Sequence, residues 1–246
     1  MNGVLRETFT VRSCHCDMMN AWLSNSVLEM MQETAGMHSD SFGLTREKMD
    51  SMNICWVLSR LTVEFSKMPA LGNQILIETY PTSEKLLFYP RSHVFYLADT
   101  MEEIGRAGSL WVLLDKNERK IVKNDTVTKG ILLDQNRKPA VGSPATVRPL
   151  TSEPIKNVIQ PRFSDIDING HVNNTKYLLW CIDAIGMDVM KDYWISSFHV
   201  NFDAEVLYGM EIETELYLDD RAFAFIGSYE GKRRFAVGGR LEKRIL

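Results

Sequence analysis

Three polar residues alternate within one short segment of the sequence: Asp167, Asn169 and His171. Alternate residues of an extended segment point to the same side, so we expect their side chains to lie together. They are a carboxylate, an amide and an imidazole: an acid–base group, a neutral donor and acceptor, and a group that titrates near neutral pH. This set of groups is suited to the hydrolysis of an acyl compound.

A mostly apolar segment typical of a helix follows, over about residues 174–185. Asn173 or Asn174 would cap its N-terminus, because asparagine side chains accept hydrogen bonds from the first N–H groups of a helix. A helix start also carries partial positive charge, so backbone N–H groups near residues 172–175 could stabilise an oxyanion. The alternative is an ordinary Asp/Asn/Gly turn that caps a helix, although such a turn needs no histidine.

The sequence contains an internal duplication, and this duplication predicts the fold. Residues 12–36 share their outline with residues 162–186 at an offset of 150, and residues 61–65 match residues 198–202 at an offset of 137. The smaller second offset indicates an insertion in the first copy, at about residues 39–53. Two matches in the same order indicate one structural unit used twice.

Each copy has the pattern of a strand, a long buried helix and then several strands. The helices expected at about residues 24–38 and 174–185 are apolar on most sides, which is typical of burial. Apolar and polar residues alternate in the segments that follow, which predicts an antiparallel sheet and an α+β architecture. Four of the eight prolines lie between the copies. We therefore expect a first half over residues 1–138, a proline-rich linker over 139–157 and a second half over 158–246.

The segment 167–177 resembles the signature of the acyl-[acyl-carrier-protein] thioesterases. Residues 56–60 and a strand containing Arg91 resemble the first domain of that family. Residues 201–205 resemble the second-domain strand that carries a catalytic glutamate. The resemblance covers nearly the whole chain. It implies a tandem, or double, hotdog fold, with two copies of a long buried helix wrapped by an antiparallel sheet.

Carried over residue by residue, the resemblance assigns the catalytic Asp, Asn, His and Glu of that family to Asp167, Asn169, His171 and Glu205. It implies an enzyme that hydrolyses the thioester of fatty acyl-[acyl-carrier-protein], releases the free fatty acid and ends chain elongation. Val206 stands where the plant members have a cysteine. A covalent Cys/His mechanism is therefore not available at this position.

Thioester hydrolysis needs a positioned water and a stabilised oxyanion, because a thiol with a pKa of about 8.5 leaves with little help from a general acid. We expect Glu205 or His171 to activate the water and Asp167 to orient its neighbours. Asn169 cannot titrate, so its amide is expected to bind water or the carbonyl oxygen. A nucleophilic Asp167 that forms a mixed anhydride is the alternative.

The first half carries Asp17, Met19 and Ala21 at the positions of the three alternating polar residues. We therefore expect one active site per chain, in the second half. The methionines of the first half have a helical spacing typical of core packing, and a flexible wall for an acyl chain is the second interpretation. On that interpretation, the candidates for substrate binding are Met19, Met30, Met31 and Asn174.

The composition of the 246-residue chain, 45% apolar and 24% charged, is that of a globular protein. The net charge of −4 argues against nucleic acid as a partner. The chain has no signal pattern and no apolar run of membrane-spanning length, so we expect a cytoplasmic protein that acts without a membrane. No second ligand pair with zinc spacing follows the segment 14–16, so we expect no metal and no other cofactor.

The expected partner is the acyl carrier protein, loaded with its acyl group as the substrate. Basic clusters are the candidates for docking this acidic protein: Lys116, Arg119, Lys120, residues 232–234 and residues 243–244. Two alternative functions remain, an acyl-CoA thioesterase of the same fold and a non-catalytic hotdog module that binds acyl thioesters. The sequence leaves open the acyl chain length, the choice between carrier protein and CoA, and a homodimeric state.

Overall fold

The strands form one antiparallel sheet in the computed structural model, which describes residues 3–244. The strands of the first half are β1 (Leu5–Thr10), β2 (Ile54–Phe65), β3 (Gln74–Pro81), β4 (Tyr89–Leu97), β5 (Glu103–Asp115) and β6 (Ile121–Val122). Those that follow are β7 (Ile155–Ile159), β8 (Tyr193–Phe202), β9 (Ile212–Asp219), β10 (Ala222–Tyr229) and β11 (Lys232–Lys243).

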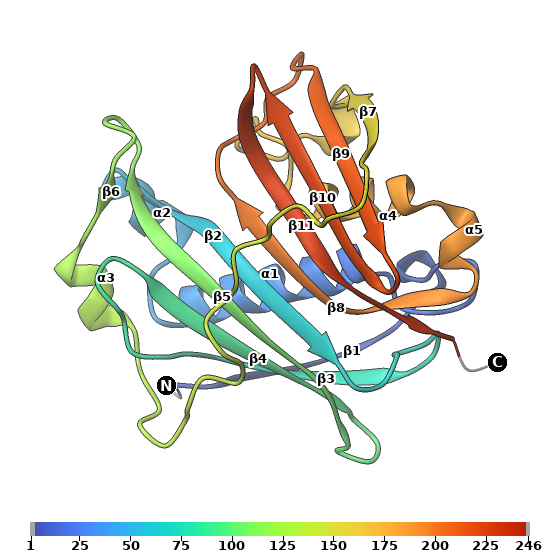
Figure 1. Cartoon of the computed structure of the whole chain (residues 1–246). Coiled ribbons are helices and arrows are strands. Elements are labelled where there is room, and N and C mark those ends of the chain that lie inside the picture. Colours follow the sequence, from blue (N-terminus) through green and yellow to red (C-terminus); the bar gives the residue numbers. More distant parts are fainter. Residues whose placement is uncertain (1–2, 245–246) are drawn as a thin grey trace.

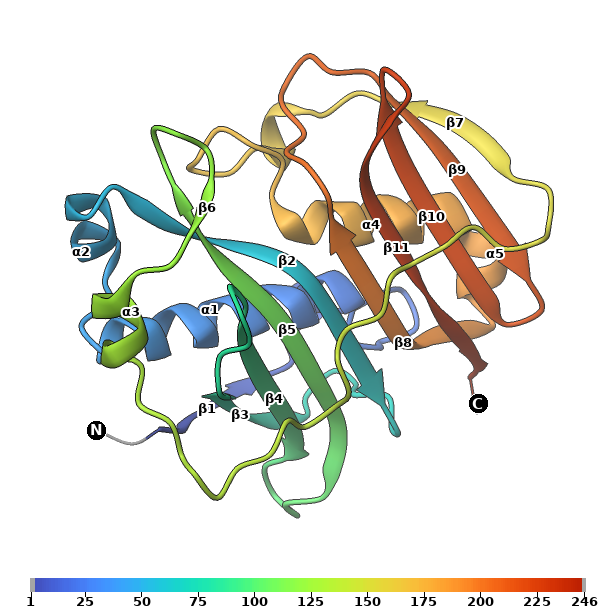
Figure 2. The same cartoon turned by 60° about the vertical axis from the view of Figure 1, so that its left-hand side comes forward.

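The order of the strands shows that the two halves are copies joined edge to edge. The order is β1-β3-β4-β5-β2-β8-β11-β10-β9-β7, with β6 paired to β5. Read from either outer edge inward, the two halves have the same order. Strands β2 and β8 therefore meet at the centre of the sheet, as both views show (Figures 1 and 2).

A pseudo-two-fold axis passes through this central pair of strands. Thr62 on β2 is the register partner of His199 on β8, and its Oγ1 lies 2.8 Å from Nδ1 of the histidine. These two residues are also equivalent by the duplication offset of 137. The strand register therefore agrees with the offset of 137 found in the sequence, because a residue on the pseudo-two-fold axis must face its own equivalent.

Two long helices cover the inner face of the sheet. They are α1 (Ser24–Ser41) and α4 (Asn174–Ile185), and they pack side by side, one from each half (Figure 2). Leu28 and Leu178, which are equivalent at an offset of 150, belong to the same apolar core and have at most 1% of their surface exposed. The structure confirms the predicted α+β architecture. Among residues 3–244, no helix combines the length and the apolar character needed to cross a membrane.

The helix boundaries agree with the sequence predictions except at one end. Asn173 is the N-cap of α4, and its side chain accepts from the N–H of Thr175 at 3.0 Å. Helix α1 continues three residues past its predicted end at His38. The short helices are α2 (Arg46–Ser51), α3 (Asp125–Gly130) and α5 (Met187–Met190). Helix α2 lies within the insertion expected in the first half.

The proline-rich segment between the halves runs over the outer face of the sheet, opposite the long helices (Figure 1). Residues 131–154 form neither helix nor strand, and β7 begins inside the range expected for the linker. The Asn201 side chain of β8 accepts from the N–H of Val147 at 2.7 Å and donates to the carbonyl oxygen of Ala145 at 2.9 Å. These bonds fix the linker across the joint between the halves.

Candidate active site

The Asp167 carboxylate organises the turn that precedes α4. Its Oδ1 accepts the backbone N–H of Asn169 at 2.8 Å and of His171 at 3.4 Å. Its Oδ2 lies 3.4 Å from the side-chain nitrogen of Asn169. Gly170 takes a left-handed conformation at φ 79°, which glycine adopts without steric cost. The alternating residues are therefore held in one tight turn, and Asp167 is its centre.

The first half builds the same turn without the other polar side chains. Oδ1 of Asp17 accepts the backbone N–H of Met19 at 2.8 Å and of Ala21 at 3.0 Å. Asn20 is left-handed at φ 63°, at the position equivalent to Gly170. The turn thus needs its aspartate in both halves, whereas Asn169 and His171 are additions found only in the second.

A short strand pairing brings Glu205 next to His171. The N–H of Val172 donates to the carbonyl oxygen of Val206 at 2.8 Å, and His171 forms a β-bridge with Leu207. Nε2 of His171 then lies 3.4 Å from Oε2 of Glu205. Both side chains are partly exposed, at 29% and 38%. The structure therefore brings the four residues named by the sequence into one place.

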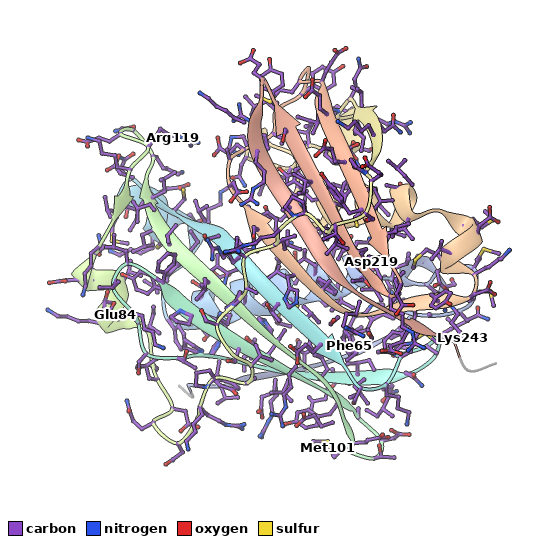
Figure 3. All side chains as sticks on the ribbon, viewed as in Figure 1. Phe65, Glu84, Met101, Arg119, Asp219 and Lys243 are labelled. Atoms are coloured by element: carbon purple, nitrogen blue, oxygen red, sulfur yellow. The ribbon has the colours of Figure 1, made fainter. Side chains whose placement is uncertain are left out.

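Arg119 is a partner of Glu205 that the sequence analysis assigned only to a docking cluster. It lies at the hairpin turn after β5, where Figure 3 labels it, and forms an ion pair with the same Glu205 oxygen that faces His171. Its hydrogen bond to Glu205 raises the pKa of Arg119. Lys116, from the same cluster, pairs with Asp50 at 2.5 Å. The first half therefore contributes a cation to the polar groups of the second.

These polar groups face a cleft of about 630 Å³ that both halves line. The end of α1, helix α2, and the ends of β2 and β5 form the side of the cleft that belongs to the first half. The second half contributes four residues to the lining: Ile168, Asn169, His171 and Glu205. The site is thus open to water and to a substrate that contacts both halves.

The backbone at the start of α4 offers fewer oxyanion donors than expected. The N–H of Val172 donates to Val206, that of Asn173 to the Asp165 carbonyl oxygen, and that of Thr175 to the Asn173 side chain. These three groups are therefore not available to a substrate. Of this run, only the N–H of Asn174 has no acceptor within the described part of the chain.

Two family models match the chain: the acyl-ACP thioesterase N-terminal domain over residues 2–131, and the C-terminal domain over residues 149–232. Together they cover most of its length. The chain belongs to the acyl-ACP thioesterase family. This result confirms the resemblance carried by the segment 167–177 and the motifs around it.

Curated members of the acyl-ACP thioesterase family are less than 30% identical to this chain. A chloroplastic palmitoyl-acyl carrier protein thioesterase of Arabidopsis thaliana is 26% identical over 220 residues, which are 82% of this chain and 52% of that protein. A chloroplastic dodecanoyl-[acyl-carrier-protein] hydrolase of Cinnamomum camphora is 28% identical over 217 residues, 82% of this chain and 56% of that protein. This chain spans about half the length of these two relatives.

Solved structures confirm the double hotdog fold. An acyl-ACP thioesterase from Bacteroides thetaiotaomicron superposes with a TM-score of 0.88 at 23% identity, covering 98% of both chains. A 12:0-ACP thioesterase from Umbellularia californica gives a TM-score of 0.86 at 20% identity, covering 99% of both chains. The two copies of a helix wrapped by a sheet are therefore the shared architecture of the family.

A second, apolar cavity of about 200 Å³ adjoins the cleft in this family member. The two share four lining residues: Gly36, Ser39, Leu44 and Trp56. The cavity lies wholly in the first half, between α1 and the inner face of the sheet. Tyr89, Trp111 and Ile131 form much of its wall. An apolar space therefore continues from the cleft into the first half.

The three methionines proposed from the sequence do not line the cleft or the apolar cavity. Met31 is 2% exposed in the main core, and Met30 lines a separate surface groove beside β1. Met19 lies in the turn that follows Asp17. Asn174 is closer to the site, because its side-chain nitrogen donates at 3.1 Å to Gln32, which lines the apolar cavity.

A cysteine that the sequence analysis did not single out lines the cleft. Cys55 lies on β2, and burial raises the pKa of its thiol, which keeps it protonated at neutral pH. Val206, next to Glu205, is fully buried. Among residues 3–244, no three His, Cys, Asp or Glu side chains are grouped so that they could hold a metal ion.

Proposed function

We propose that this chain hydrolyses the thioester of fatty acyl-[acyl-carrier-protein] and releases the free fatty acid. Membership of the acyl-ACP thioesterase family supports this reaction. The acyl-loaded carrier protein would be both substrate and partner. A cytoplasmic location and a homodimeric state stay predictions.

The observation that carries the proposal is the position of the His171–Glu205 pair. The pair lies in the cleft between the halves, and the cleft adjoins the apolar cavity through Leu44 and Trp56. An acyl thioester needs polar groups at its carbonyl carbon and apolar contacts along its chain. One bound substrate could meet both needs here.

In this proposal, His171 and Glu205 activate a water together. When His171 Nε2–H points to Oε2 of Glu205, Nδ1 remains as the acceptor for a proton of water. Arg119 holds the same carboxylate and balances its charge. The Asn169 amide is uncharged and would bind the water or the carbonyl oxygen.

Asp167 is a positioning residue in this proposal and not a nucleophile. Its carboxylate already accepts two backbone N–H groups, and Asp17 makes the same turn in the half that lacks the other polar groups. In a single turnover in ¹⁸O-labelled water, the label should enter the fatty acid and not Asp167. Label in Asp167, detected by mass spectrometry of its peptide, would support the mixed anhydride instead.

The proposal divides the work between the two halves. Residues 1–138 would supply the acyl pocket, since every residue lining the apolar cavity lies between Gln32 and Ile131. Residues 158–246 would supply the catalytic groups, and the linker over 139–157 joins them. The cation of Arg119 is the exception, because it comes from the first half.

Thiol release from acyl-carrier-protein and acyl-CoA substrates of graded chain length tests the proposal. We expect turnover on the carrier-protein substrates. His171→Ala and Glu205→Ala should each lose about a hundred- to ten-thousandfold in kcat, and the double variant little more, because the pair acts as a unit. His15→Ala, at a partly exposed position just before the equivalent turn of the first half, is the matched control. Absence of thiol release from every substrate would refute the proposal. Faster release from the acyl-CoA substrates would identify CoA, and not the carrier protein, as the group that carries the acyl chain.

A further inference from the structure

A positively charged side chain lies inside the first half without an acid beside it. Nη1 of Arg91, on β4, lies 3.0 Å from Nδ1 of His38 on α1 and 3.2 Å from Oγ1 of Thr79 on β3. Burial lowers the pKa of Arg91 to about 10, so the guanidinium is still charged at neutral pH. Within residues 3–244, no carboxylate forms an ion pair with it.

The neighbours of Arg91 do not compensate its charge. His93 is 1% exposed, and burial together with the charge of Arg91 lowers its pKa to about 3, so this ring is neutral. His38 is equally buried and stacks on the ring of Phe42, with centroids 4.4 Å apart. Glu78 precedes Thr79 on β3 and so points to the opposite face of the sheet, where two other arginines bind it.

Arg91 also lines the apolar cavity next to the cleft. An acyl chain that enters from the cleft passes Trp56 and Leu44 and then approaches Arg91. A plain hydrocarbon that reaches this point removes water from the guanidinium and offers no acceptor in return, which is unfavourable. An oxygen on the chain replaces the lost water contact.

We propose that Arg91 is a specificity-determining residue that selects acyl groups with an oxygen acceptor, a hydroxyl or keto group, on the carbon that reaches it. The inference rests on the proposed thioester hydrolysis and names the substrate class of that site. A charge-assisted hydrogen bond from Arg91 to this oxygen supplies the discrimination. For the same reason, plain chains long enough to reach Arg91 bind less well than shorter ones.

The test compares carrier-protein substrates of equal chain length on the full protein. One series is unsubstituted, and the others carry a hydroxyl or a keto group at each successive carbon. We expect kcat/KM to rise at least about tenfold at one or two adjacent positions of the oxygen, with most of the change in KM. Hydrolysis of the unsubstituted chains with no gain at any oxygen position would overturn the inference and leave the proposed function intact.

The variant Arg91→Met removes the guanidinium and so tests its contribution apart from that of the other residues that line the cavity. This variant should lose the preference for oxygen and should hydrolyse long plain chains as well as, or better than, the wild-type protein. Arg91→Lys keeps a charged donor and should retain part of the preference. The matched control is Arg60→Met, because the guanidinium of Arg60 binds Thr146 of the linker on the outer face. Loss of the preference in Arg60→Met as well would contradict the role of Arg91.

A binding measurement tests the contact between Arg91 and the oxygen of the acyl chain without turnover. Free fatty acids with and without the oxygen are added to the full protein, and the rise in Tm is compared. The oxygenated acid should raise Tm more in the wild-type protein and not in Arg91→Met. If no substrate is hydrolysed but this difference is present, the hydrolytic function fails while the binding preference stands. Equal shifts in both proteins would refute the preference.

Discussion

Arg244 forms an ion pair with Asp17, which lies 227 positions earlier in the chain. Arg244 follows β11 and is 7% exposed, and its Nε donates to the carbonyl oxygens of Met190 at 3.2 Å and Tyr193 at 2.9 Å. The guanidinium therefore fills the space beside the first turn. That space is equivalent to the one that holds the candidate active site in the second half.

The equivalent residue of the other half leaves its space open. Arg240 pairs with Ser197, and Leu110 pairs with Arg60, which lies 137 residues before Ser197, so Arg244 and Leu114 occupy matching positions. Leu114 lines the cleft and has no charged group that could fill it. A pocket of only about 20 Å³ remains beside Asp17, compared with about 630 Å³ for the cleft. Packing, and not only the loss of polar residues, thus supports the prediction of one site per chain.

Arg244→Ala should destabilise the fold by about 3 kcal/mol, because it leaves a largely buried Asp17 without its partner. Urea denaturation measures this change. Arg221→Ala is the matched control, since Arg221 forms an exposed pair with Glu242 at 3.2 Å and its loss should cost less than about 1 kcal/mol. Equal losses of unfolding free energy in the two variants would mean that the buried pair stabilises the fold no more than the exposed pair does. Turnover per folded molecule should stay unchanged in both.

His93 should make the stability depend on pH between about 6.5 and about 3. The unfolded chain binds a proton on this histidine near pH 6.5, whereas burial lowers the pKa of His93 in the folded state to about 3. The contribution is therefore fully present above pH 6.5 and is lost as the pH falls toward 3, at up to about 1.4 kcal/mol per pH unit. His93→Leu should flatten the plot of unfolding free energy against pH in this window. An unchanged slope in His93→Leu would contradict the buried neutral state.

Local sequence patterns predicted the scaffold well because the chain repeats it. The equivalence of Asp17 and Asp167 is visible when the sequence is compared with itself, and the offset of 137 makes Thr62 and His199 equivalent before any register is known. These features depend on neighbours in sequence or on self-similarity. The prediction that the segment 167–171 is extended was wrong: it is a tight turn around Asp167, and Asn169 and His171 line the cleft whereas Asp167 does not.

The remaining features depend on contacts between the halves, which no local pattern encodes. Arg119 reaches Glu205 only because β2 and β8 join the two halves in one sheet, and the sequence shows it as one more basic residue in a turn. Met30 and Met31 are adjacent on α1, yet one lies in a surface groove and the other in the core. Helical spacing does not say which face meets a cavity.

Arg119→Met should lower kcat about tenfold to a hundredfold and leave KM nearly unchanged, because Arg119 acts on the substrate through Glu205. Arg119→Lys should recover part of the loss, since lysine keeps the charge without the planar fork of donors. Steady-state kinetics on a carrier-protein substrate measures both. Arg106→Met, which removes an exposed pair with Glu103, should behave as the wild-type protein. If Arg119→Met keeps the kcat of the wild-type protein, Glu205 does not need the ion pair with Arg119 for its role in turnover.

Gly36 lies on α1 where the cleft meets the apolar cavity, and it lines both. A Cβ added at this glycine would have no atom within 4 Å. Gly36→Ala should therefore raise the unfolding free energy by up to about 1 kcal/mol, because alanine favours a helix over glycine and meets no obstacle here. Urea denaturation of the variant and the wild-type protein checks this value.

Gly36→Leu places a larger side chain at the same junction and should shorten the acyl chains that the protein accepts. We expect kcat/KM to fall tenfold or more for the longest substrates that the wild-type protein hydrolyses, while the shortest ones keep their rates. Met37→Leu, at the adjacent residue with 44% of its surface exposed, is the matched control and should leave the profile unchanged. The two cavities adjoin at Gly36, so a chain that passes from one to the other must cross this point. A folded Gly36→Leu variant with an unaltered profile would show that the acyl chain takes another route.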